Sequence, residues 1–267
     1  MIDLLDIPYR ISQLLGESHE APTAIRSVSR TDRGDRLTND DRCFRDDNKG
    51  IYLLVDGIGG HAGGRLASMI ATATITKSLE DDSSPPEGCD ALNECLHVAV
   101  SKSCQSMQRL GKVDPKYEHM GCTFALAVLR GSTLHFTSVG CVRIYLFRNG
   151  KLQQLTEDDS LVQGLVKAHA VTPNDARRHC WRNIITNSLT AKGFIHEPDW
   201  KSVEIEAGDQ LLLATNGINN SLSWSGIEDV LGETVSLDSK VDHLLESARE
   251  SESLHNASCI LISADSE

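Results

Sequence analysis

The separation of helical and strand patterns into blocks is the feature that most constrains the fold of this chain. A buried strand is expected over 51–55, and apolar periodicity then predicts helices over 65–79 and 90–110. The pattern beyond them changes to short β-rich runs divided by turn signals, over 123–129, 133–139, 143–147, 152–155, 202–205, 210–215 and 258–263. We interpret the first four runs as an antiparallel meander, and a last helix is predicted over 240–250. Such blocks favour an α+β layered sandwich over a doubly wound parallel sheet, which requires strict alternation.

The length of the chain indicates one large domain. A chain of 267 residues with 40% hydrophobic content can bury a sizeable core, and it falls within the size range of a single α/β domain. We expect a domain over 21–267, preceded by an N-terminal extension over 1–20. Apolar residues in the extension suggest an amphipathic stretch that packs on the domain or, alternatively, docks a partner.

Charge and cysteine usage exclude several functions. Asp and Glu number 38 against 26 Lys and Arg, so the formal net charge is −12, and such a surface repels the phosphate backbone of nucleic acids. Eight cysteines form no C-x-x-C pair and no secretory signal pattern opens the chain, which predicts a cytoplasmic protein with reduced thiols. No apolar run reaches the roughly 20 residues that cross a bilayer, so no membrane partner is expected.

Several catalytic motifs are absent from the sequence. No cysteine is followed by an arginine six positions later, which argues against a cysteine-nucleophile phosphatase. The sequence has no G-x-x-x-x-G-K-[ST], no H-E-x-x-H and no G-x-S-x-G. Nucleotide-phosphate binding by a P-loop, zinc hydrolysis by that motif and serine-elbow chemistry are therefore excluded.

An aspartate at the end of a buried strand is the strongest remaining signal. Asp56 and Gly57 directly follow the strand at 51–55. Magnesium and manganese prefer oxygen ligands, and a glycine lets backbone approach the ion. The same dipeptide also marks ordinary turns, so a metal site and a plain turn both remain open at this point.

Seven ordered elements connect the chain to a known family. They are R-L-T-N-D-D at 36–41, V-D-G-I-G-G-H-A-G-G at 55–64, G-C-T at 121–123, V-G-C-V-R-I-Y at 139–145, L-T-E-D-D-S at 155–160, G-D-Q-L-L-L-A-T-N-G-I at 208–218 and H-N at 255–256. In order and spacing they resemble the motifs of the metal-dependent protein serine/threonine phosphatases, the PPM or type 2C family, in their bacterial form. The resemblance covers about residues 25 to 263.

The resemblance implies a fold and a mechanism. The fold is a four-layer α-β-β-α sandwich, in which a central antiparallel β-sandwich is flanked by helices. Up to two manganese or magnesium ions lie in a cleft at one end and activate a water that attacks the phosphoryl group. Arg36 is expected to grip the phosphate oxygens with its planar fork of donors. The alternative for Arg36 is a surface ion pair with Asp35 or Asp40.

The resemblance also identifies candidate metal ligands. Asp56, the carbonyl of Gly57 and the acidic residue at Asp40 match positions around the family's second ion, and Asp41 is a further candidate metal ligand. We therefore expect this ion to keep its ligands.

Three positions depart from the family pattern. Asn216 and His255 stand where the family has aspartates around its first ion, so that ion is expected to bind more weakly. An imidazole at His255 suits manganese better than magnesium, although a structural role for this histidine is equally open. Cys141 also replaces an aspartate, and we interpret it as a small apolar substitute. His61, within the glycine-rich signature, is expected to pack rather than to catalyse.

Two functions follow from this pattern. The first is hydrolysis of phosphoserine or phosphothreonine in proteins at a depleted two-metal site, with a phosphoprotein substrate and a cognate serine/threonine kinase as partners. The alternative is a pseudophosphatase that binds or regulates a phosphoprotein without turnover. In either case we expect Asp56 and Asn216 at strand ends facing one cleft, with His255 in the same cleft.

Overall fold

The structure is a computed structural model that describes residues 22, 24–58, 62–80, 88–251 and 255–265. The extension expected over 1–20 and the side chain of His61 lie outside the described residues.

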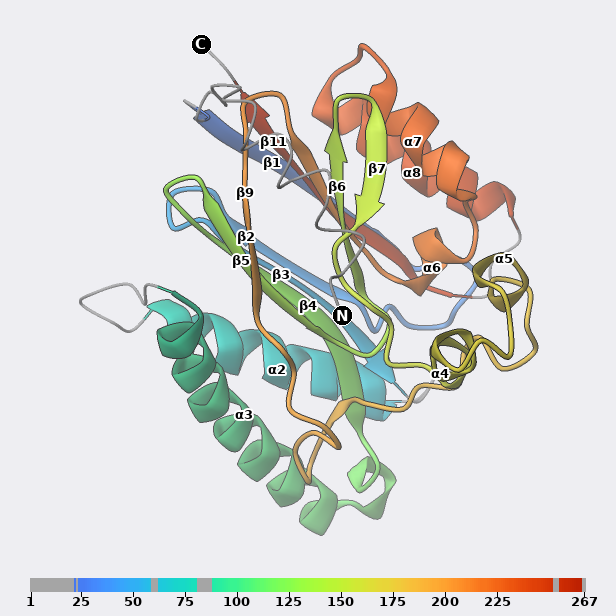
Figure 1. Ribbon diagram of the computed structural model, residues 1–267. Helices are drawn as coiled ribbons and strands as arrows, with labels where there is room; N and C mark the ends of the chain where they lie inside the picture. Colours follow the sequence, from blue (N-terminus) through green and yellow to red (C-terminus); the bar gives the residue numbers. More distant parts are fainter. Residues whose placement is uncertain (1–21, 23, 59–61, 81–87, 252–254, 266–267) are drawn as a thin grey trace.

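Two antiparallel sheets form the centre of the molecule (Figure 1). The first sheet has the order β1-β11-β10-β6-β7, with β1 at Ala24–Asp32, β11 at Ala257–Asp265, β10 at Gln210–Ala214, β6 at Arg143–Arg148 and β7 at Lys151–Gln154. The second has the order β2-β3-β4-β5-β9, with β2 at Arg42–Asp46, β3 at Ile51–Ile58, β4 at Gly121–Arg130, β5 at Thr133–Val139 and β9 at Lys201–Glu204. A short strand, β8 at Leu189–Thr190, pairs with β4.

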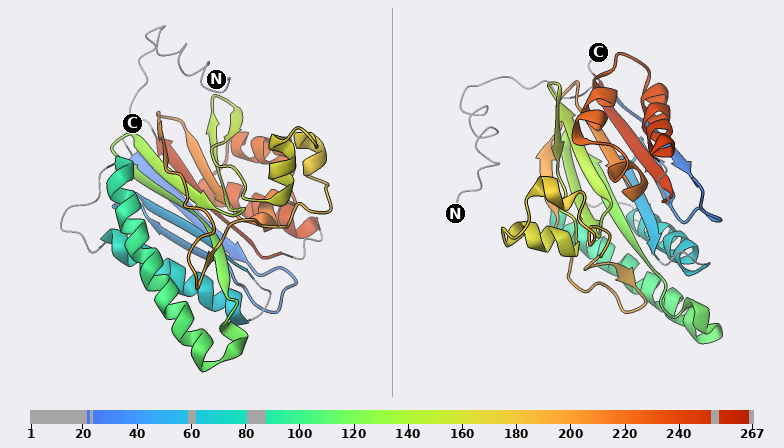
Figure 2. Two further views of the ribbon diagram at one scale, coloured as in Figure 1. Left: turned by 60° about the horizontal axis from the view of Figure 1, so that its bottom comes forward. Right: turned by 90° about the vertical axis from the view of Figure 1, so that its right-hand side faces the viewer.

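Helices cover both outer faces of this pair of sheets (Figure 2). On the second sheet lie α2 at Ala62–Glu80 and α3 at Gly88–Val113, and on the first lie α7 at Trp224–Gly232 and α8 at Leu237–Glu250. Four short helical segments complete the described fold: η1 at Pro115–Tyr117, α4 at Leu161–Lys167, α5 at Pro173–Ala176 and α6 at Asn216–Asn219. The four-layer α-β-β-α sandwich expected from the sequence is confirmed. None of the described helices has the length and apolar character needed to span a membrane.

Strand β3 shows how the apolar pattern builds three core layers. All of Ile51–Val55 is buried because both faces of the strand are covered. Leu53 and Val55 point to the layer shared with α2 and α3, whereas Tyr52 and Leu54 point to the layer between the sheets. A continuous apolar run, rather than an alternating one, is therefore the pattern that this central strand requires.

The expected meander over 123–155 is wrong at its centre. Strand β5 pairs with β4 and β9, whereas β6 pairs with β7 and β10, so the chain changes sheets between them. Gly140 makes this crossing with φ +89°, and a Cβ there would collide with the Thr123 side chain. Asp159 holds the crossing, since its carboxylate accepts from the Gly140 amide at 2.9 Å and its own amide donates back to the Gly140 carbonyl at 2.7 Å. Turn signals show where the chain bends but not which sheet it enters next.

The other expected strands and helices are present with small differences in their ends. Among the longer elements, β1, β2 and α7 were not predicted, and neither were the short elements β8, η1 and α6. Strand β1 has only one fully buried residue, Ser27, so it carries little apolar signal. It is held as an edge strand by its pairing with β11 along its whole length.

Candidate active site

The loop before β2 is fixed to the start of β11 by one side chain. Asn256 accepts a hydrogen bond from the backbone amide of Asp40 at 2.9 Å. Its amide nitrogen donates to the carbonyls of Arg33 at 2.8 Å and Thr38 at 3.0 Å. These three bonds set the position of the segment that carries the candidate residues Arg36, Asp40 and Asp41.

Asp41 is a buried carboxylate held from the opposite sheet. Asp41 is only 1% exposed, and its Oδ2 accepts a hydrogen bond from the Thr215 hydroxyl at 3.0 Å. Thr215 is held in turn by the Ser258 amide at 3.0 Å. The other oxygen of Asp41, Oδ1, is buried without a hydrogen-bond partner among the described residues. A buried acceptor without a donor is costly, so this position favours a cation or a proton.

Asp56 lies at the end of β3 beside Asp41. Burial, together with the neighbouring carboxyl of Asp41, raises the pKa of Asp56 well above its ordinary value. Burial also raises the pKa of Asp41 to about 6, against hydrogen bonds from Ser258 and Thr215 that lower it. Two buried carboxylates this close repel each other unless a positive charge joins them. Asp40, 5% exposed, adds a third negative charge that raises both pKa values.

The glycine-rich signature brings β3 against the first turn of α2. A Cβ on Gly57 would collide with the carbonyl of Gly64, so neither strand end nor helix start could approach as closely with larger residues. The Gly57 amide donates to the Asp40 carbonyl at 3.3 Å. The signature thus has a packing role that places Asp56 and the Gly57 backbone beside the Asp40 loop.

Two of the three departures from the family pattern contact each other. The Asn216 side chain donates to the Cys141 sulfur at 2.8 Å. Burial raises the pKa of the Cys141 thiol, so the sulfur is neutral, and the carboxyl of Asp56 raises that pKa further. The structure therefore brings Cys141 to both Asn216 and Asp56, although the three positions are far apart in the sequence. A neutral hydrogen-bonded pair occupies this side of the site.

His255 lies among positive rather than negative groups. It is half-buried, and burial followed by the charges of Arg36 and Arg182 lowers its pKa. A lowered pKa leaves the imidazole neutral at pH 7, the form that can bind a metal ion. Arg36 also lowers the pKa of Asp56, so its guanidinium is close enough to act on both Asp56 and His255.

A partly buried ion pair, Arg143 with Asp158, adjoins the site. Arg143 makes two hydrogen bonds to Asp158, at 2.7 and 2.6 Å, and donates to the Tyr145 hydroxyl at 3.2 Å. Tyr145 donates to Asn219 of α6 at 3.1 Å. This chain of contacts fixes the segment after β7 relative to the helix that begins at Asn216.

The sequence interpretation missed residues that act through the candidate ligands. Thr215 and Ser258 orient Asp41, and Asn256 fixes its loop. Thr215 and Asn256 lie inside the matched motifs, so each was visible as a neighbour of a candidate residue. Arg182 gave no sequence signal, because only the fold brings it near His255.

The donor chemistry fits a hard cation at Asp41 and Asp56. Within the part of the chain that the structure describes, no three His, Cys, Asp or Glu side chains are arranged to hold a metal ion. Asp41 and Asp56 are two carboxylates that the fold brings together, and backbone or amide oxygens would have to complete the shell of an ion held there. The unpartnered Oδ1 of Asp41 is an oxygen donor of the kind that manganese and magnesium prefer.

Comparisons with known proteins identify the family of this chain. Residues 30–255 match the model of the family described as protein phosphatase 2C. The protein phosphatase PhpP of Streptococcus pneumoniae is 33% identical over 221 residues, which cover 81% of this chain and 87% of that protein. The crystal structure of the Mycobacterium tuberculosis serine/threonine phosphatase PstP/Ppp superposes with a TM-score of 0.81 at 30% identity, covering 91% of this chain and 99% of that one.

A second structure of PstP contains metal. It is the catalytic domain in complex with two manganese ions, and it superposes with a TM-score of 0.79 at 28% identity, over 91% of this chain and 99% of that one. The matched family model spans most of the chain, and the PhpP relative is 33% identical with 87% of its length covered. The chain therefore belongs to the protein phosphatase 2C family.

Proposed function

We propose that this protein hydrolyses phosphoserine or phosphothreonine in proteins, with a metal-activated water, at a site where the first of two metal positions is weakened. The observation that carries the proposal is the buried pair Asp41 and Asp56 beside Arg36, in a chain of this family. Manganese or magnesium, when bound, supplies a hydroxide at neutral pH and stabilises charge on the phosphoryl group.

The metal ion that binds more tightly would be held by Asp41, Asp56 and the Gly57 carbonyl. Asp40 would lie beside this ion. Thr215 fixes one oxygen of Asp41, which leaves the unpartnered oxygen as the donor. Because the Thr215 hydroxyl already orients this carboxylate, little reorganisation of Asp41 would oppose binding.

Arg36 has the chemistry and the position to orient the substrate. Its charge acts on both Asp56 and His255, so it lies at the same cleft as the carboxylates. A guanidinium binds two phosphate oxygens at once, which aligns the phosphorus with the attacking water.

The weakened position is the one next to Asn216 and His255. An amide and an imidazole replace two negative ligands there, and Asn216 already donates to Cys141. Neutral ligands lose the attraction between a carboxylate and a dication, so occupancy should require a higher concentration of metal. Nitrogen ligation favours manganese over magnesium.

The substrate in this proposal is a phosphoprotein, and the reaction that supplies it is phosphoryl transfer to serine or threonine by a protein kinase. A cognate serine/threonine kinase is therefore the expected partner. The relatives named above as protein phosphatases support this substrate class.

The test is hydrolysis of a phosphothreonine peptide at increasing manganese concentration, combined with direct metal analysis of the same sample. We expect phosphate release that depends on manganese and is lost in Asp56→Asn. The matched control is Asp35→Asn, which removes an exposed carboxylate one residue before Arg36 and should keep the rate. Peptide binding without phosphate release at saturating manganese would instead indicate the pseudophosphatase alternative.

A further inference from the structure

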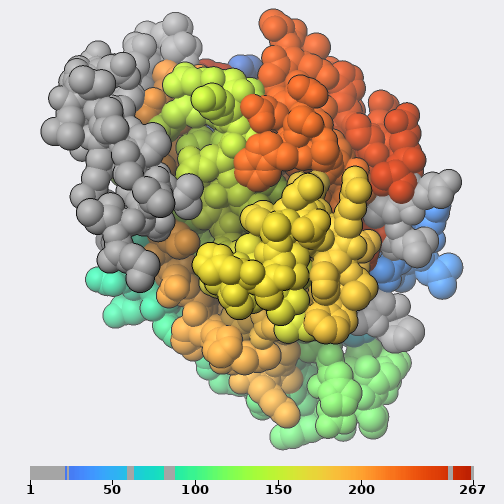
Figure 3. Space-filling view, turned by 45° about the vertical axis from the view of Figure 1, so that its right-hand side comes forward, coloured from blue at the N-terminus to red at the C-terminus, as the bar shows by residue number. Residues whose placement is uncertain are grey.

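A cavity adjoins the candidate active site on the side of Asn216. It has a volume of about 320 Å³ and lies between the segment 154–182 and the residues around α6 and α7. In Figure 3 the yellow part of this segment lies against the orange region that contains α7. Asn216 lines the cavity and also contacts Cys141 at the active site, so the cavity and the site share a wall.

The charged lining of this cavity is mostly positive. Three arginines, Arg143, Arg177 and Arg182, meet a single carboxylate, Asp158. That carboxylate is already used, because Arg143 binds it through two hydrogen bonds. The remaining two arginines give the cavity a net positive charge on a protein whose formal charge is −12.

The two remaining arginines differ in how they are held. Arg177 donates to the Leu222 carbonyl at 2.6 Å, which anchors the end of α5 to the turn before α7. The exposed Arg182 side chain has no hydrogen-bond or ion-pair partner among the described residues, and its charge reaches His255 at the active site. The N–H donors of Arg182 are thus available, and Arg177 is held in place in the same cavity. Such a pair of guanidinium groups is suited to binding an anionic side chain.

The other walls are apolar or carry neutral amides. Trp224 is 39% exposed and packs edge-to-face on Tyr145 with ring centroids 6.0 Å apart, so its ring is fixed. Val162, Val166 and Pro173 line the cavity from the segment with α4 and α5. A cavity with a fixed aromatic wall and two cations fits a short stretch of peptide better than a free ion, because the ion would leave the apolar walls uncovered.

We propose that this cavity binds the residues of the substrate that flank the phosphorylated side chain, and that Arg177 and Arg182 select an acidic side chain there. The inference rests on the proposed phosphatase function and adds a sequence preference to it. A peptide whose phosphate is at the metal site passes Asn216 to reach the cavity. Its acidic side chain then meets Arg182 at the near side and Arg177 at the α5 side.

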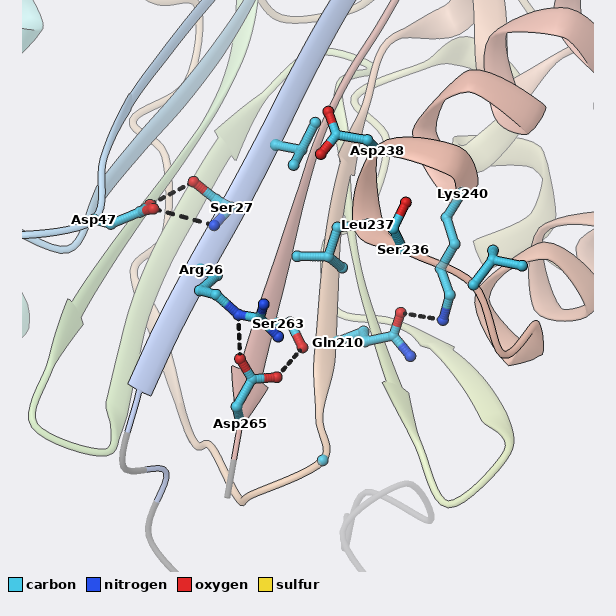
Figure 4. Close-up of a pocket in the computed structure, with 13 residues that line it drawn as sticks. Arg26, Ser27, Asp47, Gln210, Ser236, Leu237, Asp238, Lys240, Ser263 and Asp265 are labelled. Atoms are coloured by element: carbon cyan, nitrogen blue, oxygen red, sulfur yellow. Dashed lines mark hydrogen bonds and ion pairs between the residues drawn. The ribbon is translucent and has the colours of Figure 1, made fainter. Parts of the chain in front are cut away.

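A second cavity shows what makes this one distinct. It has a volume of about 560 Å³ and lies by β1 and the start of α8 (Figure 4). Arg26 there is paired with Asp265 at 2.6 Å, and Lys240 donates to Gln210 at 3.0 Å. Its lining contains three carboxylates, from Asp47, Asp238 and Asp265, against these two cations, so that cavity has no excess of positive charge.

The test compares hydrolysis of phosphothreonine peptides that differ at one flanking residue. Aspartate, asparagine or lysine is placed in turn at each position within about four residues of the phosphothreonine, a reach of ~13 Å in extended peptide. At one or more positions we expect kcat/KM for the aspartate peptide to exceed that for the asparagine peptide at least ~5-fold, equal to ~1 kcal/mol. The lysine peptide should be the poorest.

The variants Arg177→Gln and Arg182→Gln should each move the ratio of aspartate to asparagine peptide towards one. Arg178→Gln is the matched control, because Arg178 is an exposed arginine of the same segment that does not line the cavity. It should keep both the ratio and the rate. Arg182 makes no side-chain hydrogen bond or ion pair within the described residues, so its variant separates lost recognition from lost folding.

A ratio near one at every position in the natural protein overturns the inference, as does a ratio unchanged in both arginine variants. Hydrolysis of p-nitrophenyl phosphate, which is too small to reach the cavity, reports the proposed function separately. If this compound is cleaved but the peptides show no preference, only the inference fails. If neither p-nitrophenyl phosphate nor the peptides are cleaved, the proposed function fails. In that case fluorescence anisotropy with the same peptides measures the preference for a flanking acidic residue as a ratio of Kd values. Equal Kd values for the aspartate and lysine peptides would then overturn the inference as well.

Discussion

Replacing Asp41 by asparagine should stabilise the metal-free protein at neutral pH and remove its response to manganese. The replacement has nearly the same shape as the original side chain. Its amide oxygen can still accept from the Thr215 hydroxyl, which lies 3.0 Å from Oδ2 in the natural protein. The amide nitrogen can donate to a neighbouring carboxylate, so the main change is the loss of one buried negative charge.

The magnitude follows from the pKa of Asp41, which burial raises from 3.8 to about 6. The folded state binds this proton more tightly than the unfolded state, so stability falls as pH rises from about 4 through about 6 and stays lowered above that range. A tenfold change in proton affinity is worth about 1.4 kcal/mol, which gives a loss of about 3 kcal/mol at pH 7.5. The asparagine variant has no ionisable group at this position, so its stability does not fall for this reason as the pH rises.

The assay is urea unfolding in the presence of a chelator at pH 4.5 and pH 7.5, and again at pH 7.5 with manganese. We expect Asp41→Asn to be more stable than the natural protein at pH 7.5 by up to about 3 kcal/mol, with a smaller difference at pH 4.5. Manganese should stabilise the natural protein and leave the variant almost unchanged, because binding to the folded state alone raises stability. A variant that is less stable at pH 7.5 without metal, or that gains as much from manganese, would refute the reasoning.

The remaining predictions concern the altered ligands and the crossing between sheets. The double replacement Asn216→Asp with His255→Asp should raise manganese-dependent hydrolysis of a phosphothreonine peptide at least ~10-fold, or ~1.4 kcal/mol of barrier, and Asp56→Ala in that background should abolish the gain. Two bound manganese ions with an unchanged rate would show that more than ligand loss separates the site from its family. Calorimetric titration of the natural protein should give tighter binding of manganese than of magnesium, and the reverse order would argue against His255 as a ligand. Gly140→Ala should lower the free energy of unfolding by more than ~2 kcal/mol in urea titrations, because its φ is +89° and a Cβ has no room. Gly131→Ala, with positive φ but open space, should cost less.

The sequence by itself determined the family and the fold class. Seven short motifs in a fixed order predicted the α-β-β-α sandwich, and strands with a strong pattern such as β3 were placed correctly. Their signals are local, because glycine at a tight approach and a continuous apolar run are required wherever the strand lies. Edge strand β1 was missed because one buried residue in nine leaves no periodic pattern.

Only the tertiary structure shows which residues that are far apart in the sequence contact each other. The crossing at Gly140 moves β6 into the other sheet, and this brings Cys141 against Asn216. It also decided that Thr215 would hold Asp41 from the opposite sheet. Contacts between sheets depend on strand order and on loop paths, which short-range patterns do not encode, and the environment that raises a pKa depends on all the groups that fold around it. The sequence therefore predicts which types of side chain form this site, and the packing of the two sheets determines which charged groups surround them.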